Sequence, residues 1–362
     1  MVVKLVDYYI GRAAILGTLA IWLGLTLLFI LFAILGEVRD TQNDYTTTDA
    51  LWFVTLTIPR MAYEVFPVSA LLGALVGVGG LAAANELVAF RTSGVSRLRL
   101  ALAALAGTLS LSVPVMIMGE WVAPAAEHQA RAFRLSEKVG QAIIGGPRGM
   151  WMRDGANIVN IQLPLLSADR GEQSVDFNNV VIYAFADSID LQSVTRAARA
   201  THDNATWTLQ EVTEVRFDEQ GAQSAYTGER AWDTQVKPEL LDSAVTRPVK
   251  LSLRSLSGYL DYLQKNGLDA TVYEAAFWEK VLYPFSIIAL VLAGMPFVFG
   301  AARTHNVGVR MFFGMVLGGL FMIVSRLMQS FGEAYQVHAL FTNALPPLLL
   351  GMAAIFILRR SV

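Results

Sequence analysis

Six apolar stretches, each long enough to cross a bilayer, are the feature that most restricts how this 362-residue chain can fold. A helix needs roughly 20 residues to cross about 30 Å of hydrocarbon. One of the six is interrupted by Arg326 and resumes to Gly332. The uncharged stretches are Ala13–Gly36, Val65–Ala84, Leu100–Gly119, Val281–Ala302, Met311–Ser325 and Ala339–Leu358. The sequence therefore predicts an α-helical integral membrane protein with six transmembrane helices.

A polar segment separates the first three stretches from the last three. Residues 123–274 hold 35 of the 58 Lys, Arg, Asp and Glu residues, although the whole chain is only 16% charged. Soluble domains average about 25% charged residues, so the flanking parts are too apolar for water. We expect three parts: transmembrane helices 1–3 in residues 1–122, a polar domain in 123–274, and transmembrane helices 4–6 in 275–362.

Basic residues mark the loops that we expect in the cytoplasm. They precede the first stretch, follow the second and fourth, and end the chain: Lys4, Arg12, Arg91, Arg97, Arg99, Arg303, Arg310, Arg359 and Arg360. The loop after the first stretch instead has a single basic residue, Arg39, among several acids. Both termini are therefore predicted to be cytoplasmic and the polar domain extracytoplasmic, which in a bacterium means periplasmic or beyond.

The polar domain has the pattern of a β domain. Gly149–Arg153 and Asn157–Gln162 flank Asp154-Gly155, which is typical of a two-residue hairpin turn. Val180–Ala186 is rich in β-formers, and Thr206–Phe217 alternates apolar and polar residues as a half-buried strand does. Short strands at this spacing predict a sandwich, roll or barrel-like sheet. Leu256–Gln264, before Asn266-Gly267, is expected to be helical.

The chain lacks the motifs of the common enzyme classes. None of its six lysines follows a glycine, so the ATP-binding phosphate loop is absent. The four histidines are scattered, and with no cysteine a disulfide framework, thiol chemistry and a Cys-based metal site are excluded. A net charge of −2 indicates no polyanionic partner such as nucleic acid. We therefore predict a non-enzymatic protein with no catalytic residues, no metal site and no cofactor in this chain.

The segment Asn85–Arg99 between the second and third stretches favours a short cytoplasmic helix at about residues 85–95. Asn85 is a suitable cap for Glu86–Thr92, Gly94 a suitable terminator, and Ser96 a suitable cap for the third span. Such a helix could dock into a groove on a partner. Alternatively, the segment is an ordinary basic loop, and spacing alone leaves both interpretations open.

Two groups of arginines near the outer surface are candidate binding residues. Arg60 and Glu64 are four residues apart and share a helical face, either as a functional group or as a self-neutralising pair. Arg131 and Arg134, just beyond the third stretch, are three apart on an expected helical extension. Guanidinium groups suit phosphate binding. They could equally anchor the helix to lipid headgroups.

Several motifs along the whole chain point to one family. They are Asp7-Tyr8-Tyr9-Ile10-Gly11-Arg12, Phe66-Pro67 leading to Gly80, Glu86-Leu87-Val88 with Ser93-Gly94, Gly119-Glu120-Trp121-Val122-Ala123-Pro124, and Gly149-Met150-Trp151 with Asp154-Gly155. With the three-plus-three arrangement around a β domain, they resemble the LptF/LptG family of lipopolysaccharide export permeases, and its LptG members more than its LptF members. The inserted domain would then be a periplasmic β-jellyroll-like domain.

The resemblance implies the permease of an ABC-type exporter. Such a permease extracts lipopolysaccharide from the outer leaflet of the inner membrane and passes it to a periplasmic bridge toward the outer membrane. The implied partners are a second permease, LptF, in a heterodimer, a dimer of the ATPase LptB, which binds the ATP, LptC, and LptA through the β-domain bridge.

The resemblance also implies roles for individual residues. Glu86 matches the glutamate of the family's coupling helix, and with Asn85 and Arg91 it forms the expected ATPase-coupling site. Arg60, Arg131 and Arg134 match basic residues that face the lipid phosphates. Similar chains carry several lysines after the first span, where this chain has only Arg39. We include Arg39 as a candidate and expect the missing contacts to shift to Arg60 and the Arg131/Arg134 pair.

Two alternative functions need features that this sequence offers only weakly. A membrane-anchored sensor or scaffold with a ligand-binding β domain needs a cytoplasmic output domain, but the longest inner segment has only about 15 residues. An ion-coupled transporter needs acids within its spans. Glu64 is the one candidate, and Arg60 stands beside it.

Overall fold

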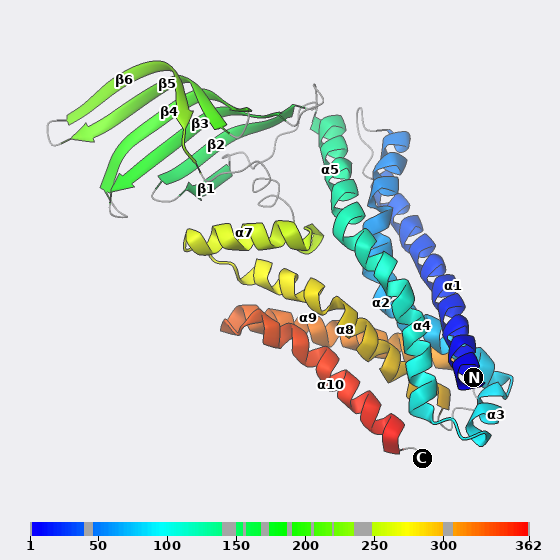
Figure 1. The fold of residues 1–362 in the computed structure, drawn as a ribbon. Helices are drawn as coiled ribbons and strands as arrows, with labels where there is room; N and C mark the ends of the chain where they lie inside the picture. Colours follow the sequence, from blue (N-terminus) through cyan, green and yellow to red (C-terminus); the bar gives the residue numbers. More distant parts are fainter. Residues whose placement is uncertain are drawn as a thin grey trace. The chain divides into compact units, whose positions relative to one another are not determined.

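The structure is a computed structural model that describes residues 2–39, 46–139, 150–154, 157–167, 174–186, 190–203, 206–218, 221–234, 248–299 and 307–360 (Figure 1). The chain divides into two compact units. The first comprises residues 1–41, 50–130 and 271–362, and the second residues 42–49 and 131–270. Each unit is described by itself.

The first unit is helical. Its elements are α1 (Val2–Arg39), most of α2 (Thr47–Ala83), α3 (Glu86–Thr92), α4 (Arg97–Ile117), a π-helical turn (Met118–Val122), the start of α5 (Ala123–Val139), α8 (Thr271–Phe299), α9 (Val307–Tyr335) and α10 (Ala339–Arg360). Six membrane-spanning candidates lie in the described part of the chain. The predicted six spans are therefore confirmed, and Arg326 does not interrupt α9.

Small residues allow α1 to approach α2 closely. A Cβ added at Gly17 would lie 2.3 Å from the carbonyl oxygen of Gly73 and 2.9 Å from the Cα of Gly77. The backbones therefore touch at a point where no larger side chain fits, as is common between membrane helices. Beyond this contact the Trp22 indole donates a hydrogen bond to the Ala62 carbonyl at 2.7 Å. Much of the remaining surface of α1 is exposed, including Leu27 and Phe32.

One predicted loop residue lies inside a helix. Arg310 was expected in the basic loop between the fourth and fifth spans. It instead lies in α9, which begins at Val307, and its side chain is 3% exposed. The prediction is wrong because tertiary packing buries this charge and gives it a backbone acceptor, the Gly79 carbonyl. Arg303, the other arginine of that loop, lies outside the described residues.

The second unit contains an antiparallel sheet. Its strands are β1 (Met150–Asp154), β2 (Asn157–Ser167), β3 (Ser174–Ala186), β4 (Asp190–Asp203), β5 (Thr206–Asp218) and β6 (Gly221–Trp232). Each described strand pairs with its neighbour in sequence, in the order β1-β2-β3-β4-β5-β6, and the sheet is visibly curved (Figure 1). The expected strand pair around Asp154 is confirmed, with Asp154 opposite Asn157, although Gly149 and Gly155 lie outside the described residues.

The sheet refines the expected β architecture. A jellyroll folds two Greek keys into two packed sheets, whereas the described strands form one open sheet in meander order. Their buried face includes Phe177 stacked on Trp207 at 4.6 Å between ring centroids. Thr206–Phe217 falls within β5, as its alternation predicted. The expected helix is α7 (Leu253–Lys265), and the Ser252 side chain caps it by accepting from the Ser255 N–H at 3.0 Å.

Candidate functional site

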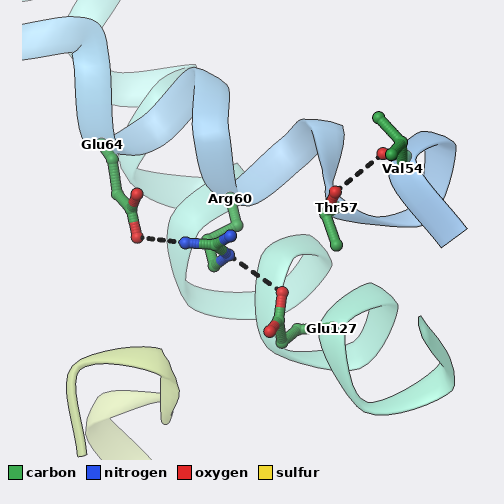
Figure 2. Close-up of polar contacts among 5 residues, drawn as sticks. All are labelled: Val54, Thr57, Arg60, Glu64 and Glu127. Carbon is green, nitrogen blue, oxygen red and sulfur yellow. Dashed lines mark hydrogen bonds and ion pairs between the residues drawn. The ribbon is translucent and has the colours of Figure 1, made fainter. Parts of the chain in front are cut away.

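Arg60 joins two helices through a pair of carboxylates (Figure 2). Its Nη1 donates to Glu64 at 2.8 Å within α2, which confirms the pairing expected from their spacing. Its Nε donates to Glu127 of α5 at 2.9 Å. The side chain of Glu127 is 4% exposed, compared with 44% for Glu64. The buried partner of Arg60 is therefore an acid that sequence spacing did not identify, because it lies 67 residues away.

This contact places constraints on what Arg60 can do. A buried carboxylate is costly unless it is paired and hydrogen-bonded, so Arg60 compensates Glu127 and fastens α2 to the start of α5. Two of its three nitrogens make these contacts, and its Nη2 has no partner among the described residues. The side chain is 22% exposed. Arg60 can thus hold α2 and α5 together and still donate hydrogen bonds to a ligand from its Nη2.

Two tyrosines form a second junction in the same unit. The rings of Tyr63 and Tyr283 stack at 4.3 Å, and the Tyr283 hydroxyl donates to the Tyr63 carbonyl at 2.8 Å. That carbonyl lies four residues before Pro67, which has no N–H with which to complete the helix. Tyr283 of α8 therefore supplies the hydrogen bond that Pro67 withholds from α2.

A π-helical turn receives the Tyr63 ring. Gly119 lies in this turn, and a Cβ added to it would be 2.2 Å from the Tyr63 ring. Lys280 of α8 places its Nζ 5.9 Å from the centre of the same ring. Single-turn π-bulges often occur at functional sites. Sequence reasoning singled out the GEWVAP motif but not the aromatic and cationic groups that surround it, since these come from separate helices.

The predicted short cytoplasmic helix is α3, with the bounds Glu86–Thr92 that were expected. Gly94 adopts φ +88° and ends it: the Gly94 N–H bonds to Arg91 and the Val95 N–H to Phe90, a Schellman arrangement. Ser96 caps α4 as predicted, by accepting from the Arg99 N–H. Asn85 differs from expectation.

Asn85 makes no side-chain cap and instead adopts a left-handed backbone with φ 62°. Asparagine tolerates this conformation better than most residues, so it turns the chain sharply from α2 into α3. Leu87 anchors α3 in the helical core with 4% exposure. Asn85 and Arg91 are exposed, and Glu86 is half-buried. The exposed side of α3 thus carries both charge and amide groups.

The remaining candidate arginines lie on α1 and α5. Arg39 is the last residue of α1 and is exposed. Arg131 lies on α5, half-buried, four residues after Glu127. Arg134 also lies in α5, but its side chain is outside the described residues. Of these arginines, the structure therefore connects Arg60 to α5, through Glu127.

Comparisons with known proteins agree with the fold. Residues 8–360 match the family described as lipopolysaccharide export system permease LptF/LptG. The chain is 31% identical to lipopolysaccharide export system permease protein LptG of Haemophilus influenzae over 353 residues, which is 96% of each chain. It is 30% identical to the protein of the same name from Escherichia coli K12 over 365 residues, 98% of each chain.

Proposed function

The chain belongs to the LptF/LptG family of lipopolysaccharide export system permeases, and on this premise we propose that it extracts lipopolysaccharide from the outer leaflet of the inner membrane. It then passes the lipid to a periplasmic bridge toward the outer membrane. The observation that carries the proposal is the family match over residues 8–360, which includes both the six spans and the β domain. The chain is a multi-pass inner-membrane protein and a component of the Lpt transport system.

ATP hydrolysis is assigned to a separate subunit, a dimer of the ATPase LptB, and no cofactor to this chain. The absence of a phosphate loop supports this division of labour. We place the docking site for LptB on α3, with Glu86, Asn85 and Arg91 as its contact residues. The exposed face of α3 and its firm attachment through Leu87 suit a helix that must transmit force.

The orientation follows from the basic loops. We place both termini and α3 in the cytoplasm, and the β domain in the periplasm. In support, Asp7 near the start of α1 pairs with Arg99 at the start of α4 at 3.0 Å, and Tyr9 stacks edge-on against Phe90 of α3. The beginning of α1, α3 and the beginning of α4 therefore lie on one side of the helical unit.

The lipid phosphates are assigned to Arg131, Arg134, Arg39 and the free edge of Arg60. A guanidinium group presents two parallel N–H donors that match two oxygens of one phosphate. Arg131 and Arg134 are the principal pair, because both belong to the helix that continues from the third span. Arg60 contributes less, because Glu64 and Glu127 already occupy two of its nitrogens.

The partner permease LptF completes the heterodimer, and LptC and LptA continue the β bridge. The meander has two edge strands among the described residues, β1 and β6, each with one paired neighbour. An edge strand with free N–H and C=O groups can add a strand from another sheet. Such edges support a continuous route for the lipid from one β domain to the next.

Reconstitution tests the proposal. This chain, LptF, the LptB dimer and LptC are placed in liposomes with lipopolysaccharide, and transfer to soluble LptA is followed by photocrosslinking. We expect transfer only with ATP and with all subunits present, and no ATP hydrolysis by this chain alone. ATP turnover by the isolated chain, or an assembled complex that hydrolyses ATP without moving lipid, would contradict the assignment.

A further inference from the structure

Arg310 is a buried cation that the proposed substrate and docking sites do not use. Its side chain is 3% exposed on α9, and its Nη1 donates to the Gly79 carbonyl of α2 at 2.6 Å. Its Nε is buried and has no hydrogen-bond partner in the part of the chain that the structure describes. No acid among the described residues forms an ion pair with it. A charge in this position needs a physical reason to stay buried.

The C-terminal end of α2 supplies that reason. Gly79 lies one turn before the end of this helix at Ala83, where the aligned peptide dipoles concentrate negative partial charge. The missing side chain of Gly79 also gives the guanidinium room. A Cβ added there would lie 3.0 Å from Nη1, whereas one added at the neighbouring Gly80 would meet nothing within 4 Å.

The Arg310–Gly79 contact is the first of several along one face of α9 that packs on α2. Arg310, Gly314 and Gly318 recur every four residues and are buried. A Cβ added at Gly314 would lie 2.4 Å from a Leu75 methyl, and one added at Gly318 would lie 3.4 Å from a Leu71 methyl. The next buried residue of α9 is Gly332, which packs on Thr342 of α10. Helix α9 therefore packs on α2 along its first half.

This attachment point lies next to the docking helix. Four residues separate Gly79 from the end of α2, and α3 begins at Glu86 after the left-handed turn at Asn85. The turn at Asn85 joins α3 directly to this end of α2, and Leu87 of α3 is buried in the helical core. The Gly79 carbonyl that Arg310 binds therefore lies seven residues before the start of α3.

We propose that Arg310 is a positioning residue that couples the docking helix to α9. Movement of α3 driven by the ATPase carries the end of α2, and α9 follows because its guanidinium group is bound to that end. A hydrogen-bonded charge suits this role better than an apolar contact does, since it has one preferred acceptor and cannot slide along the helix. The inference rests on the proposed function, because it requires an ATPase bound at α3.

The test separates coupling from folding. The variants are Arg310→Met, which removes the charge at similar length, Arg310→Lys, which keeps a cation and donor, and Gly79→Ala, which crowds Nη1. Gly80→Ala is the matched control. Each is reconstituted with LptF, LptB and LptC, and both ATP hydrolysis and lipopolysaccharide transfer to LptA are measured. We expect Arg310→Met and Gly79→Ala to lower the amount of lipopolysaccharide transferred per ATP at least tenfold, with a rate of ATP hydrolysis within twofold of the parent's. Arg310→Lys should retain partial transfer, and Gly80→Ala should match the parent.

A distance measurement adds a readout that folding alone does not change. The chain contains no cysteine, so spin labels can be placed at Ala89 of α3 and Leu320 of α9, which are both exposed. In the parent complex we expect ATP to change the orientation of the two helices together and leave their separation nearly constant. In Arg310→Met the same addition should change the separation.

The outcomes distinguish this inference from the function on which it rests. If the parent complex transfers no lipid, the proposed function fails. If the parent transfers lipid and Arg310→Met transfers the same amount of lipid per ATP hydrolysed, the coupling role is wrong. Loss of assembly in both Arg310→Met and Gly79→Ala, with Gly80→Ala intact, would also overturn it by assigning the contact to folding.

Discussion

Arg60 donates from Nε to the buried carboxylate of Glu127 at 2.9 Å, and this contact joins helices whose residues are 67 positions apart (Figure 2). The same guanidinium group binds the more exposed Glu64 one turn along its own helix. The two acids are not equivalent, because only Glu127 has lost its solvent. Arg60 therefore has a structural role in addition to any contact with lipid, and the two roles can be separated by mutation.

Arg60→Met should destabilise the helical unit strongly. It breaks the ion pair between Arg60 and the buried carboxylate of Glu127, and breaking a buried pair typically costs about 3–5 kcal/mol. Arg60→Met combined with Glu127→Gln should recover much of this loss, since a neutral amide at position 127 does not need the guanidinium charge. Thermal unfolding of the purified protein in detergent, followed by tryptophan fluorescence, measures both.

Lys265→Ala is the control for that series. Lys265 pairs with Asp261 at 2.6 Å, but both side chains are 63% exposed, so we expect a change of about 0.5 kcal/mol or less. Equal losses for Arg60→Met and Lys265→Ala would show that the Glu127 carboxylate is not effectively buried.

Gly119→Ala should disturb the tyrosine junction. Its added Cβ would lie 2.2 Å from the Tyr63 ring, so the ring or the π-helical turn must move. Overpacking of this kind typically costs about 1–3 kcal/mol. Gly24→Ala in α1, where nothing lies within 4 Å, should be nearly neutral. A double-mutant cycle of Gly119→Ala with Tyr63→Ala in the unfolding assay tests the cause, and additive losses would exclude a clash between these two residues.

Glu86→Ala should weaken the binding of LptB and leave the fold of this chain intact. It removes the charged contact that we propose between α3 and LptB, and truncating one member of a buried charged pair typically costs about 2–5 kcal/mol, with less at a rim. The amount of LptB that co-purifies, together with the ATPase rate, measures the effect. Glu333→Ala, an exposed acid at the far end of α9, is the control. Normal LptB stoichiometry and normal transfer in Glu86→Ala would remove Glu86 from the coupling site.

Substitutions at Arg131 and Arg134 should distinguish binding of lipid phosphates from simple anchoring at the headgroups. If they bind lipid phosphates in bidentate fashion, exchange of both for lysine should already reduce transfer several-fold, and exchange for glutamate should abolish it. If they only anchor α5 at headgroups, the lysine variant should behave as the parent does. Photocrosslinking groups at both positions, with the exposed Ala89 of α3 as the control position, report the contact directly. An assembled, transporting complex without lipid adducts at either position would refute the assignment.

Local sequence was sufficient to predict the elements of this fold. The six spans follow from the length of the apolar stretches, because a bilayer requires about 20 such residues whatever their neighbours are. The bounds of α3 follow from Gly94, since its positive φ satisfies the last carbonyls of the helix. The strand Thr206–Phe217 follows from its alternation, which a half-buried sheet imposes. Each of these patterns depends on residues close together in sequence.

Contacts between distant segments were decided by the tertiary structure alone. Sequence spacing paired Arg60 with Glu64 but could not reveal Glu127, and it took Arg310 for a loop cation when it is buried against Gly79. Whether a charge can be buried depends on the acceptors that other helices bring to it, and their identity is not encoded in the spacing around the charge. The sequence by itself determined which six stretches are long and apolar enough to cross a membrane. The packing of the helices decided which charges, such as Arg60 and Arg310, bind one helix to another.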